Sequence, residues 1–409
     1  MKQLYISYKW ELILMLWVAY FLNQGDRQIF NAVIPLIKAD LRLTDVQLGL
    51  VASVFTIVYG CLVPFGGYLG DFLKRKWIVL SSLFVFSVGT LCTGFSGGLI
   101  ALIVLRGITT GGGEAFYYPA ATSLISQYHQ KSRALAMSIH QTALYVGIVV
   151  SGFIAAYVGE HFGWRMSFFT FGLGGLLLCV YLFFRMEDTP QEVQEKRHPI
   201  GFVVKAIFRK KTVWMLCLAF GGMCFVNIGF VTWMSTFYHE HFHLPLSTAG
   251  FTSMFFHFAA AFMGVLLGGK LSDKYALKRK TIRLETELVG LLLGAPFIFW
   301  MGYTTHLYVS YAMLACFGFF RGIYDSNLYA ALFDVIEPDL RASSVGIMTA
   351  FAFIVGALAP LVLGYLKTDF GLALGISSLS VGYLFGACMI FIALKCFFLK
   401  EYYVDKKTE

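Results

Sequence analysis

The sequence predicts an all-α membrane protein with about twelve transmembrane helices in two pseudo-symmetric six-helix halves. Three observations predict this class: an apolar composition, recurrent apolar stretches of membrane-spanning length, and a duplicated polar loop. Hydrophobic residues make up 58% of the 409 positions and charged residues only 13%, a composition that water-soluble globular domains do not show. The lipid bilayer is therefore the expected surroundings of most of the chain.

Apolar stretches long enough to cross a bilayer recur from one end of the chain to the other, since a spanning helix needs roughly 20 residues. The polar breaks between them place the predicted spans at residues 11–35, 46–70, 77–97, 99–127, 134–158, 165–185, 213–238, 247–272, 284–303, 308–333, 342–366 and 372–397. The first span follows a polar N-terminus without a small-residue cleavage site, so we expect it to be a retained helix.

A duplicated loop divides the chain into halves. Gly66-Gly67-Tyr68-Leu69-Gly70-Asp71 follows the second span and Gly268-Gly269-Lys270-Leu271-Ser272-Asp273 follows the eighth, almost half the chain later, and a basic cluster closes each loop. The most polar segment lies midway between these loops. We therefore predict an N-terminal half at 1–186, a cytoplasmic linker at 187–212 and a C-terminal half at 213–409.

The basic residues indicate the orientation in the membrane. With both termini inside, the inward loops carry most of the loop Lys and Arg, whereas the outward loops hold only Lys38, Arg42, Arg165 and Lys367. By the positive-inside rule this asymmetry places both termini in the cytoplasm of a multi-pass protein in the cell (inner) membrane. It also accounts for the net charge of +9 without a nucleic-acid partner.

Cysteine and glycine patterns exclude several other classes. All eight cysteines fall inside predicted spans without CxxC spacing, so neither a disulfide nor a metal site is expected. The run Gly111-Gly112-Gly113 follows no strand and lies within a span, so it predicts close helix packing rather than nucleotide binding. We expect no cofactor.

The duplicated loop also carries a family resemblance. Gly67, Asp71, Arg75 and Lys76 fit the loop signature of the major facilitator superfamily, while Phe72 and Lys74 depart from it. The chain resembles that superfamily over its whole length, which implies its fold, alternating access between the halves and a working monomer. The implied conformational-switch residues of the two loops are Gly67, Asp71, Arg75, Asp273, Lys274 and Arg279.

Further motifs narrow the resemblance. The run Leu22-Asn23-Gln24-Gly25-Asp26-Arg27, together with Arg106, Gly113-Glu114-Ala115, Pro119-Ala120, Arg133 and Gly163-Trp164, resembles the anion:cation symporters, which include hexuronate carriers. The Asp-Arg pair and Gly-Glu-Ala are also similar to Spinster-like lipid transporters. The resemblance implies a carrier of a small organic anion, with a Spinster-like lipid or drug exporter as the alternative.

Charged residues within the spans are the strongest candidates for function. A charge at the centre of a transmembrane helix costs roughly 2.5–3.5 kcal/mol on insertion scales, so each should face the bundle interior and have a partner. The mid-span charges that we single out are Asp26, Arg27, Arg106, Glu114, Arg321 and Asp325. At about 100° per residue, Arg106 shares a face with Thr110 and Tyr117, and Glu114 is displaced from Arg106 by roughly 80°.

Each charge has a functional and a structural interpretation. Arg106 suits two-point binding of a substrate carboxylate, or it fixes packing through an inter-helix salt bridge. Glu114 and Asp26 suit proton coupling, because burial raises the pKa of a carboxyl and a nearby arginine lowers it. Alternatively, Arg27 keeps Asp26 ionised as its charge partner. Arg321 and Asp325 stand at i,i+4, so they form an intrahelical pair or a gate, with Asp325 a further coupling candidate.

Polar side chains on other spans would complete a site for a hydroxyl-rich solute, although each is also a candidate for an inter-helix hydrogen bond. The predicted substrate-binding set, besides Arg106, is Asn23, Tyr117, Tyr118, His140, Gln141, Tyr145 and Asn327, and Asn227, Trp233 and His257 are further candidates. The histidines His239, His241 and His243 lie in an outward loop without HExxH spacing, which argues against a metal site.

The function expected from these features is secondary active symport of a sugar acid (hexuronate- or sialate-like), driven by H+ or alternatively Na+. No Walker-type loop is present, so ATP-driven transport is not expected. An intramembrane enzyme is the third possibility, but the spans contain neither a Gly-x-Ser-x-Gly elbow nor a paired-aspartate arrangement.

Overall fold

A computed structural model describes residues 7–129, 132–187, 205–276, 278–337 and 340–403. Every regular element in these ranges is a helix. Contacts divide the chain into two compact units, 1–195 with 243–251 and 196–242 with 252–409. Most of the predicted linker, residues 188–204, lies outside the described residues.

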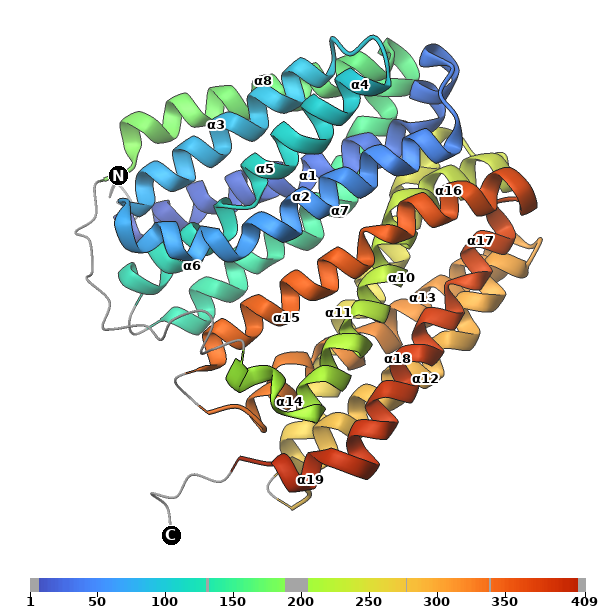
Figure 1. The fold of residues 1–409 in the computed structure, drawn as a ribbon. Helices are drawn as coiled ribbons and strands as arrows, with labels where there is room; N and C mark the ends of the chain where they lie inside the picture. The colour runs from blue at the N-terminus through green and yellow to red at the C-terminus, as the bar shows by residue number, and fades with distance from the viewer. Residues whose placement is uncertain (1–6, 130–131, 188–204, 277, 338–339, 404–409) are drawn as a thin grey trace, which may run out of the picture. The chain divides into compact units, whose positions relative to one another are not determined.

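The first unit contains six membrane-length helical segments, coloured blue to green in Figure 1. Five of them are single helices: α1 (Tyr8–Leu41), α2 (Asp45–Phe72) and α3 (Arg75–Thr93) precede the fourth segment, and α7 (Arg133–Phe162) and α8 (Trp164–Arg185) follow it. The fourth segment is interrupted and consists of α4 (Leu99–Leu102), the π-helix η1 (Ile103–Thr110), α5 (Gly111–Glu114) and α6 (Tyr117–Tyr128).

The second unit repeats this order. It contains α10 (Lys211–His241), α11 (Leu246–Ala276, whose first turn belongs to the first unit), α12 (Ile282–Tyr303), α13 (Leu307–Asp325) with α14 (Leu328–Phe333), α15 (Arg341–Gly356) with α16 (Leu358–Phe370), and α17 (Leu372–Ser378) with α18 (Ser380–Ile392), η3 (Ala393–Phe397) and α19 (Phe398–Glu401). Each predicted span coincides with one of these helices or with a run of consecutive ones.

Packing within each unit follows one plan. In the first unit α1 lies along α7 and α3 lies along α8, and in the second unit α10 lies along α15 and α12 along α18. The turn before the sixth helix is the same in both units, because Gly163 and Gly371 have positive φ angles of 88° and 85°. Glycine adopts this conformation without a Cβ penalty. The predicted six-helix repeat is therefore present in the backbone.

The length and composition of the helices suit a bilayer. Eleven segments among the described residues are long and apolar enough to cross a membrane. The remaining one, α1, is a helix of 34 residues, but the polar run from Asn23 to Gln28 lowers its hydropathy. A helix satisfies its own backbone hydrogen bonds, which is what allows such segments to cross lipid. The predicted class, an all-α membrane protein, is confirmed.

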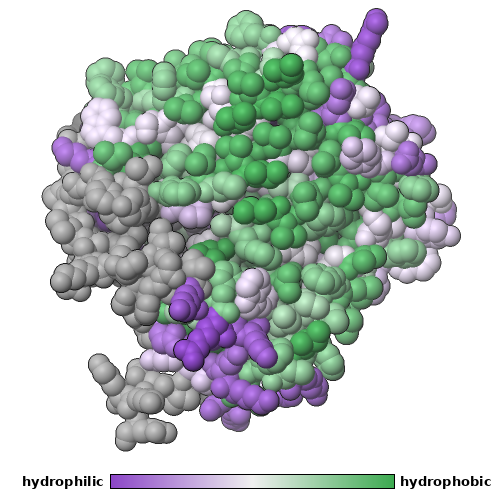
Figure 2. Space-filling view, viewed as in Figure 1, coloured by the Kyte–Doolittle hydropathy of each residue, from purple (hydrophilic) through white to green (hydrophobic). Residues whose placement is uncertain are grey.

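The exposed side chains are apolar where lipid would contact them. Phe184 and Ile100 are 81% and 78% exposed, and both lie in membrane-length segments. Figure 2 shows a face on which hydrophobic residues dominate, with the hydrophilic ones gathered mostly at its edges. A water-soluble monomer rarely presents apolar patches of this extent. The surface therefore matches a hydrocarbon environment.

A polar cluster marks one end of the first unit, beyond the predicted span 11–35. Asp40 accepts hydrogen bonds from Arg165 Nη1 at 2.5 Å and Trp164 Nε1 at 3.0 Å, and Arg165 also donates to the carbonyl of Ser96. These bonds, from Arg165 first and Trp164 second, lower the pKa of the Asp40 carboxyl from its ordinary value. The cluster ties α1 to the start of α8.

Candidate functional site

The fourth segment of the first unit contains a stretch of π-helix. Residues 103–110 form a π-helix, in which each amide bonds the carbonyl five residues earlier. The hydroxyls of Thr109 and Thr110 follow the same spacing, donating to the carbonyls of Val104 and Leu105 at 2.9 Å. Single π-helical turns occur frequently at functional sites. Arg106 projects from this turn.

Glycines bring the backbone of the next turn against two neighbouring helices. A Cβ atom on Gly111 would lie 2.9 Å from the carbonyl oxygen of Phe55 in α2, and one on Gly113 would lie 2.7 Å from the backbone nitrogen of Phe86 in α3. A Cβ atom on Gly112 would make only ordinary van der Waals contacts, the nearest with the Leu62 side chain at 3.5 Å. The predicted role of this run in close helix packing is therefore fulfilled by two of its three glycines.

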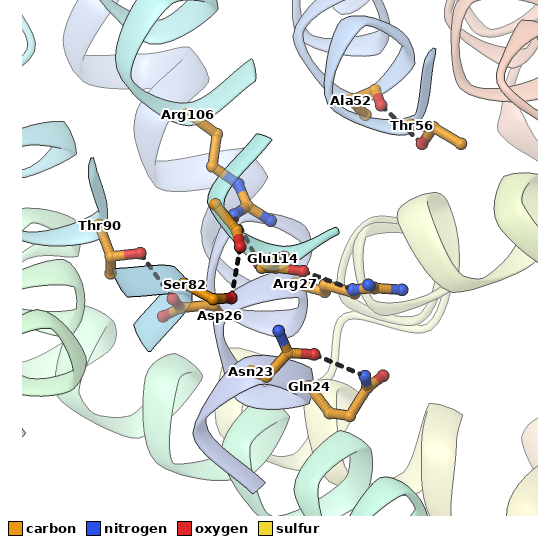
Figure 3. A network of polar contacts seen from close by, with 11 residues as sticks. Asn23, Gln24, Asp26, Arg27, Ala52, Thr56, Ser82, Thr90, Arg106 and Glu114 are labelled. Atoms are coloured by element: carbon orange, nitrogen blue, oxygen red, sulfur yellow. Dashed lines mark hydrogen bonds and ion pairs between the residues drawn. The ribbon is translucent and has the colours of Figure 1, made fainter. Parts of the chain in front are cut away.

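Four charged side chains meet at this point from α1 and the fourth segment (Figure 3). Arg27 Nε donates to Glu114 Oε2 at 2.7 Å, and Arg106 Nη1 lies 3.9 Å from Glu114 Oε1. Asp26 points to the opposite side and accepts a hydrogen bond of 2.8 Å from Thr90 Oγ1 in α3. Two acids and two bases make this charged quartet neutral when all four are ionised.

The separation of Arg106 and Glu114 corrects one geometric expectation. Regular α-helical geometry placed the two residues about 80° apart around the helix. The structure instead brings them within 3.9 Å of each other. The π-helix is the physical reason, because it takes more residues per turn and changes the register between Arg106 and Glu114.

Aromatic rings of α2 cover the two guanidinium groups. The Arg27 guanidinium carbon lies 4.1 Å from the ring centroid of Tyr59, and that of Arg106 lies 4.3 Å from the centroid of Phe55. Such contacts contribute roughly 0.5–2 kcal/mol, more when desolvated. Neither residue is in the predicted set, although their i,i+4 spacing places them on one face of α2 and is a signal of a shared role.

The charged quartet keeps unused hydrogen-bonding capacity. Among the described residues, no hydrogen-bond partner reaches Arg27 Nη2, Arg106 Nη1 or Glu114 Oε1, and all three atoms are buried. A buried donor or acceptor without a partner costs about 1–3 kcal/mol, and more when it is charged. The side chains differ in access, since that of Arg106 is 4% exposed and that of Arg27 20%. Two guanidinium edges are thus available to a ligand that reaches them.

The second unit has its own charged centre. Arg321 Nε lies 3.3 Å from Asp325 Oδ2, so the intrahelical pair is present. Arg321 Nη1 also donates to Asn227 Oδ1 of α10 at 2.5 Å and lies 2.9 Å from His257 Nε2 of α11. Those two side chains were among the further candidates, and they link three helices through one arginine.

The two units share a helix break beside an acid. In the first unit the helix ends at Glu114 and resumes at Tyr117, and in the second it ends at Asp325 and resumes at Leu328. Each carboxyl therefore stands next to backbone that is not in a regular helix. Irregular backbone at membrane depth is tolerated where it is buried in protein or lines a water-filled cavity.

Of the aromatic residues predicted to bind substrate, Tyr117 and His140 are buried between helices and Tyr118 is exposed. Tyr117 is fully buried and its hydroxyl donates to the carbonyl of Leu16 at 2.5 Å, so it holds α6 against α1. His140 is buried against the ring of Tyr20 at 4.7 Å, and its Nε2 has no partner among the described residues. Tyr118 is 39% exposed and lies 3.4 Å from Gln141 Oε1.

The remaining predicted substrate residues are dispersed. Tyr145 is half-buried on α7, and Asn23 accepts a hydrogen bond from Gln24 at 3.0 Å while its amide nitrogen has no partner in the described part of the chain. Asn327 belongs to the second unit, where its amide donates to Ser326 at 2.9 Å in the break before α14. Trp233 is buried and donates to the carbonyl of Pro360 at 3.0 Å.

The predicted switch loops are described in part. Gly67 and Asp71 fall in the last turns of α2, where side chains lie outside the described residues. Arg75 donates to Gln127 of α6 at 3.1 Å, and Arg279 pairs with Glu285 of α12 at 3.0 Å. Asp273 and Lys274 are exposed at the end of α11.

One buried acid was absent from the sequence-based set. Glu287 lies inside the predicted span 284–303 and is fully buried in α12. Its signal in the sequence was the same as for Glu114, a carboxyl within an otherwise apolar stretch. Elsewhere, no group of three or more His, Cys, Asp or Glu side chains in the described ranges could hold a metal ion, and this includes the loop of His239, His241 and His243.

These features define the class of protein. Membrane-length helices in two units of one packing plan, with charges enclosed inside them, are the architecture of a polytopic membrane transporter. The model of the Major Facilitator Superfamily matches residues 16–360, and the chain belongs to that superfamily. The resemblance seen in the loop signature is therefore confirmed.

Comparison with known proteins gives relatives over most of the chain. It is similar to a probable sulfoacetate transporter, SauU, of Cupriavidus necator, at 27% identity with 85% of this chain and 84% of the relative covered. It is also similar to the hexuronate transporter of Bacillus subtilis, at 24% identity with 89% of each covered. A crystal structure of a bacterial homolog of the human lysosomal transporter Spinster matches with a TM-score of 0.85 at 21% identity, covering 97% of this chain and 99% of that one.

Proposed function

We propose that this protein carries a small organic anion, such as a sugar acid, together with a proton, by alternating access. The observation that carries the proposal is the charged quartet, in which Arg27 and Arg106 each keep a buried guanidinium nitrogen without a hydrogen-bond partner among the described residues. Guanidinium is the side chain suited to two-point binding of a carboxylate. Relatives named for sulfoacetate and hexuronate transport, both organic anions, support the same substrate class.

Charge balance supports coupling to a proton. The quartet is neutral when Asp26, Arg27, Arg106 and Glu114 are all ionised, so a bound monoanion would leave an enclosed net charge of −1. Protonation of one carboxyl restores neutrality, and an uncompensated charge in a low-dielectric interior is strongly disfavoured. Anion binding and proton binding therefore favour each other at one site, which is the thermodynamic requirement for symport.

The structure suggests a division of roles within the quartet. Arg27 has the more exposed side chain and lies against Tyr59, so we propose that it meets the solute first. Arg106 is more enclosed and would engage the carboxylate once the pair with Glu114 loosens. Glu114 contacts both guanidinium groups and is the member best placed to exchange a proton for an anion. Asp26, held by Thr90, is the second coupling candidate.

The test is transport in proteoliposomes with labelled sugar acids, neutral sugars and a lysolipid, with and without an inward acid gradient. We expect a carboxylated sugar to accumulate with the gradient. Arg106→Ala should abolish uptake, whereas Glu114→Gln should keep solute exchange and lose gradient-driven accumulation. Arg209→Ala and Asp369→Asn, both exposed and outside the quartet, are the matched controls and should transport normally.

Other outcomes distinguish the alternatives. Movement of the lysolipid alone would favour a Spinster-like exporter, since the bacterial Spinster homolog shares the fold of this chain. Accumulation driven by a sodium gradient at constant pH would replace H+ with Na+ as the coupling ion. Anion uptake that is unaffected by both Arg106→Ala and Glu114→Gln would contradict the proposed site. Cysteine accessibility from outside and inside would test the cytoplasmic placement of both termini.

A further inference from the structure

Glu287 is an acid in the second unit that no interaction explains. Its side chain is fully buried in α12, and neither carboxyl oxygen has a hydrogen-bond partner among the described residues. An ionised carboxylate without a donor is strongly disfavoured in an apolar interior, whereas the neutral acid is far less costly to bury. The surroundings of Glu287 therefore suit a carboxyl that carries a proton.

Helix packing places Glu287 beside the break of the second unit. It lies on the buried face of α12, between Leu284 and Leu291. One turn further along, a Cβ atom on Gly290 would lie 2.8 Å from the backbone nitrogen of Tyr324, which shows how closely α12 approaches α13. Residues three apart on a helix share a face, so Glu287 points toward the end of α13.

Titratable groups from each packed element surround this carboxyl. Asp325 and Asp334, which flank α14, are its electrostatic neighbours. Tyr324 of α13 is a further one, and Tyr383 of α18 lies next to Tyr324. The hydroxyls of both tyrosines are buried and have no partner in the described ranges.

Both neighbouring carboxyls already have a cation. Asp325 pairs with Arg321 at 3.3 Å, and Asp334 pairs with Arg283 in the first turn of α12. Glu287 lies on α12 one turn from Arg283. It is therefore between the pair of Arg321 with Asp325 and the pair of Arg283 with Asp334. It alone of the three acids has no positively charged partner among the described residues.

We propose that Glu287 is a proton-binding site of the second unit and carries one of the protons coupled to transport. It holds the proton as the neutral acid while enclosed. When the end of α12 opens to water, the O–H bond breaks, the proton passes to water and the carboxylate remains. This inference rests on the proposed proton-coupled function, and it adds to the charged quartet a second site in the other unit.

The transport test uses Glu287→Gln, which replaces the neutral acid with a neutral amide of the same shape. With the membrane potential clamped at zero, each coupled proton multiplies the accumulation ratio tenfold per pH unit of gradient. We therefore expect Glu287→Gln to accumulate about tenfold less solute at a gradient of one pH unit, and to exchange solute within about twofold of the unmodified protein. The matched control is Glu285→Gln on the same helix, because Glu285 is partly exposed and bonded to Thr281 and Arg279.

An infrared test reads the proton without transport. The unmodified protein at neutral pH should show a protonated-carboxyl carbonyl band that disappears in Glu287→Gln and remains in Glu285→Gln. If Glu287→Gln accumulates solute like the unmodified protein, or if the infrared band is unchanged, the inference is wrong. If the unmodified protein accumulates no anion with the gradient, the proposed function fails instead, and the infrared band alone decides whether Glu287 is a proton site.

Discussion

The ion pair between Arg27 and Glu114 should contribute measurably to stability as well as to transport. Arg27 Nε lies 2.7 Å from Glu114 Oε2, and the Glu114 side chain has no exposed area. Glu114→Ala leaves the guanidinium groups of Arg27 and Arg106 without their shared anion. Breaking a buried pair from one side costs about 3–5 kcal/mol, and since the Arg27 side chain is 20% exposed we expect about 3 kcal/mol.

A double-mutant cycle isolates the pair from the rest of the site. The charged hydrogen bond itself is worth about 1.5–3 kcal/mol, so Arg27→Ala combined with Glu114→Ala should be less destabilised than the sum of the single variants by about 2 kcal/mol. The assay is denaturant unfolding of the purified protein in micelles, followed by tryptophan fluorescence. Effects that add to within about 0.5 kcal/mol would refute the reasoning, because independent sites add to that degree.

Three further predictions follow from contacts in the first unit. Gly113→Ala should lower the free energy of unfolding by about 1–3 kcal/mol through its clash with the backbone of α3. Gly112→Ala adds a methyl group at ordinary contact distance from its neighbours, so it should be neutral or slightly stabilising in the same unfolding assay. Asp40→Asn should destabilise the protein at neutral pH, and this effect should disappear in acid. The reason is that the hydrogen bond from Arg165 lowers the pKa of Asp40 in the folded protein. The stabilisation by the Asp40 carboxylate is therefore present above its ordinary pKa and is lost as the pH falls through its folded-state pKa. A difference between the two proteins that grows below pH 4 would contradict that sign. Thr90→Val should cost about 1–3 kcal/mol by removing the donor to a buried carboxylate, and an unchanged melting curve would show that the bond contributes nothing.

The helices could be predicted from the sequence because the membrane imposes a simple rule on them. A stretch of about 20 apolar residues without internal polar partners has to be a helix, and the predicted spans match the observed segments closely. The repeat was equally visible, since the loop ending at Asp71 and the loop ending at Asp273 carry the same pattern. The loop ending at Asp71 also indicated the major facilitator superfamily, because it carries the loop signature of that family.

The arrangement of the site could be predicted only in part. The pair of Arg321 with Asp325 follows from helical spacing alone, but the meeting of Arg106 with Glu114 depends on a π-helix that ideal α-helical angles do not contain. Contacts between helices, such as Phe55 over Arg106, depend on packing between segments far apart in the sequence. No spacing rule in a single sequence fixes those distances.

The π-helix that carries Arg106 also connects the shape of the fourth segment to its chemistry. Such a turn holds one residue more than an α-helical turn, and relaxing it would rotate one end of the segment against the other by about the 100° that separates successive residues. Arg106 would then turn away from Glu114 while Gly113 stayed locked against α3. A single helix would in this way exchange its contacts by tightening locally from a π-helical to an α-helical turn, without a rigid-body movement of the helices around it.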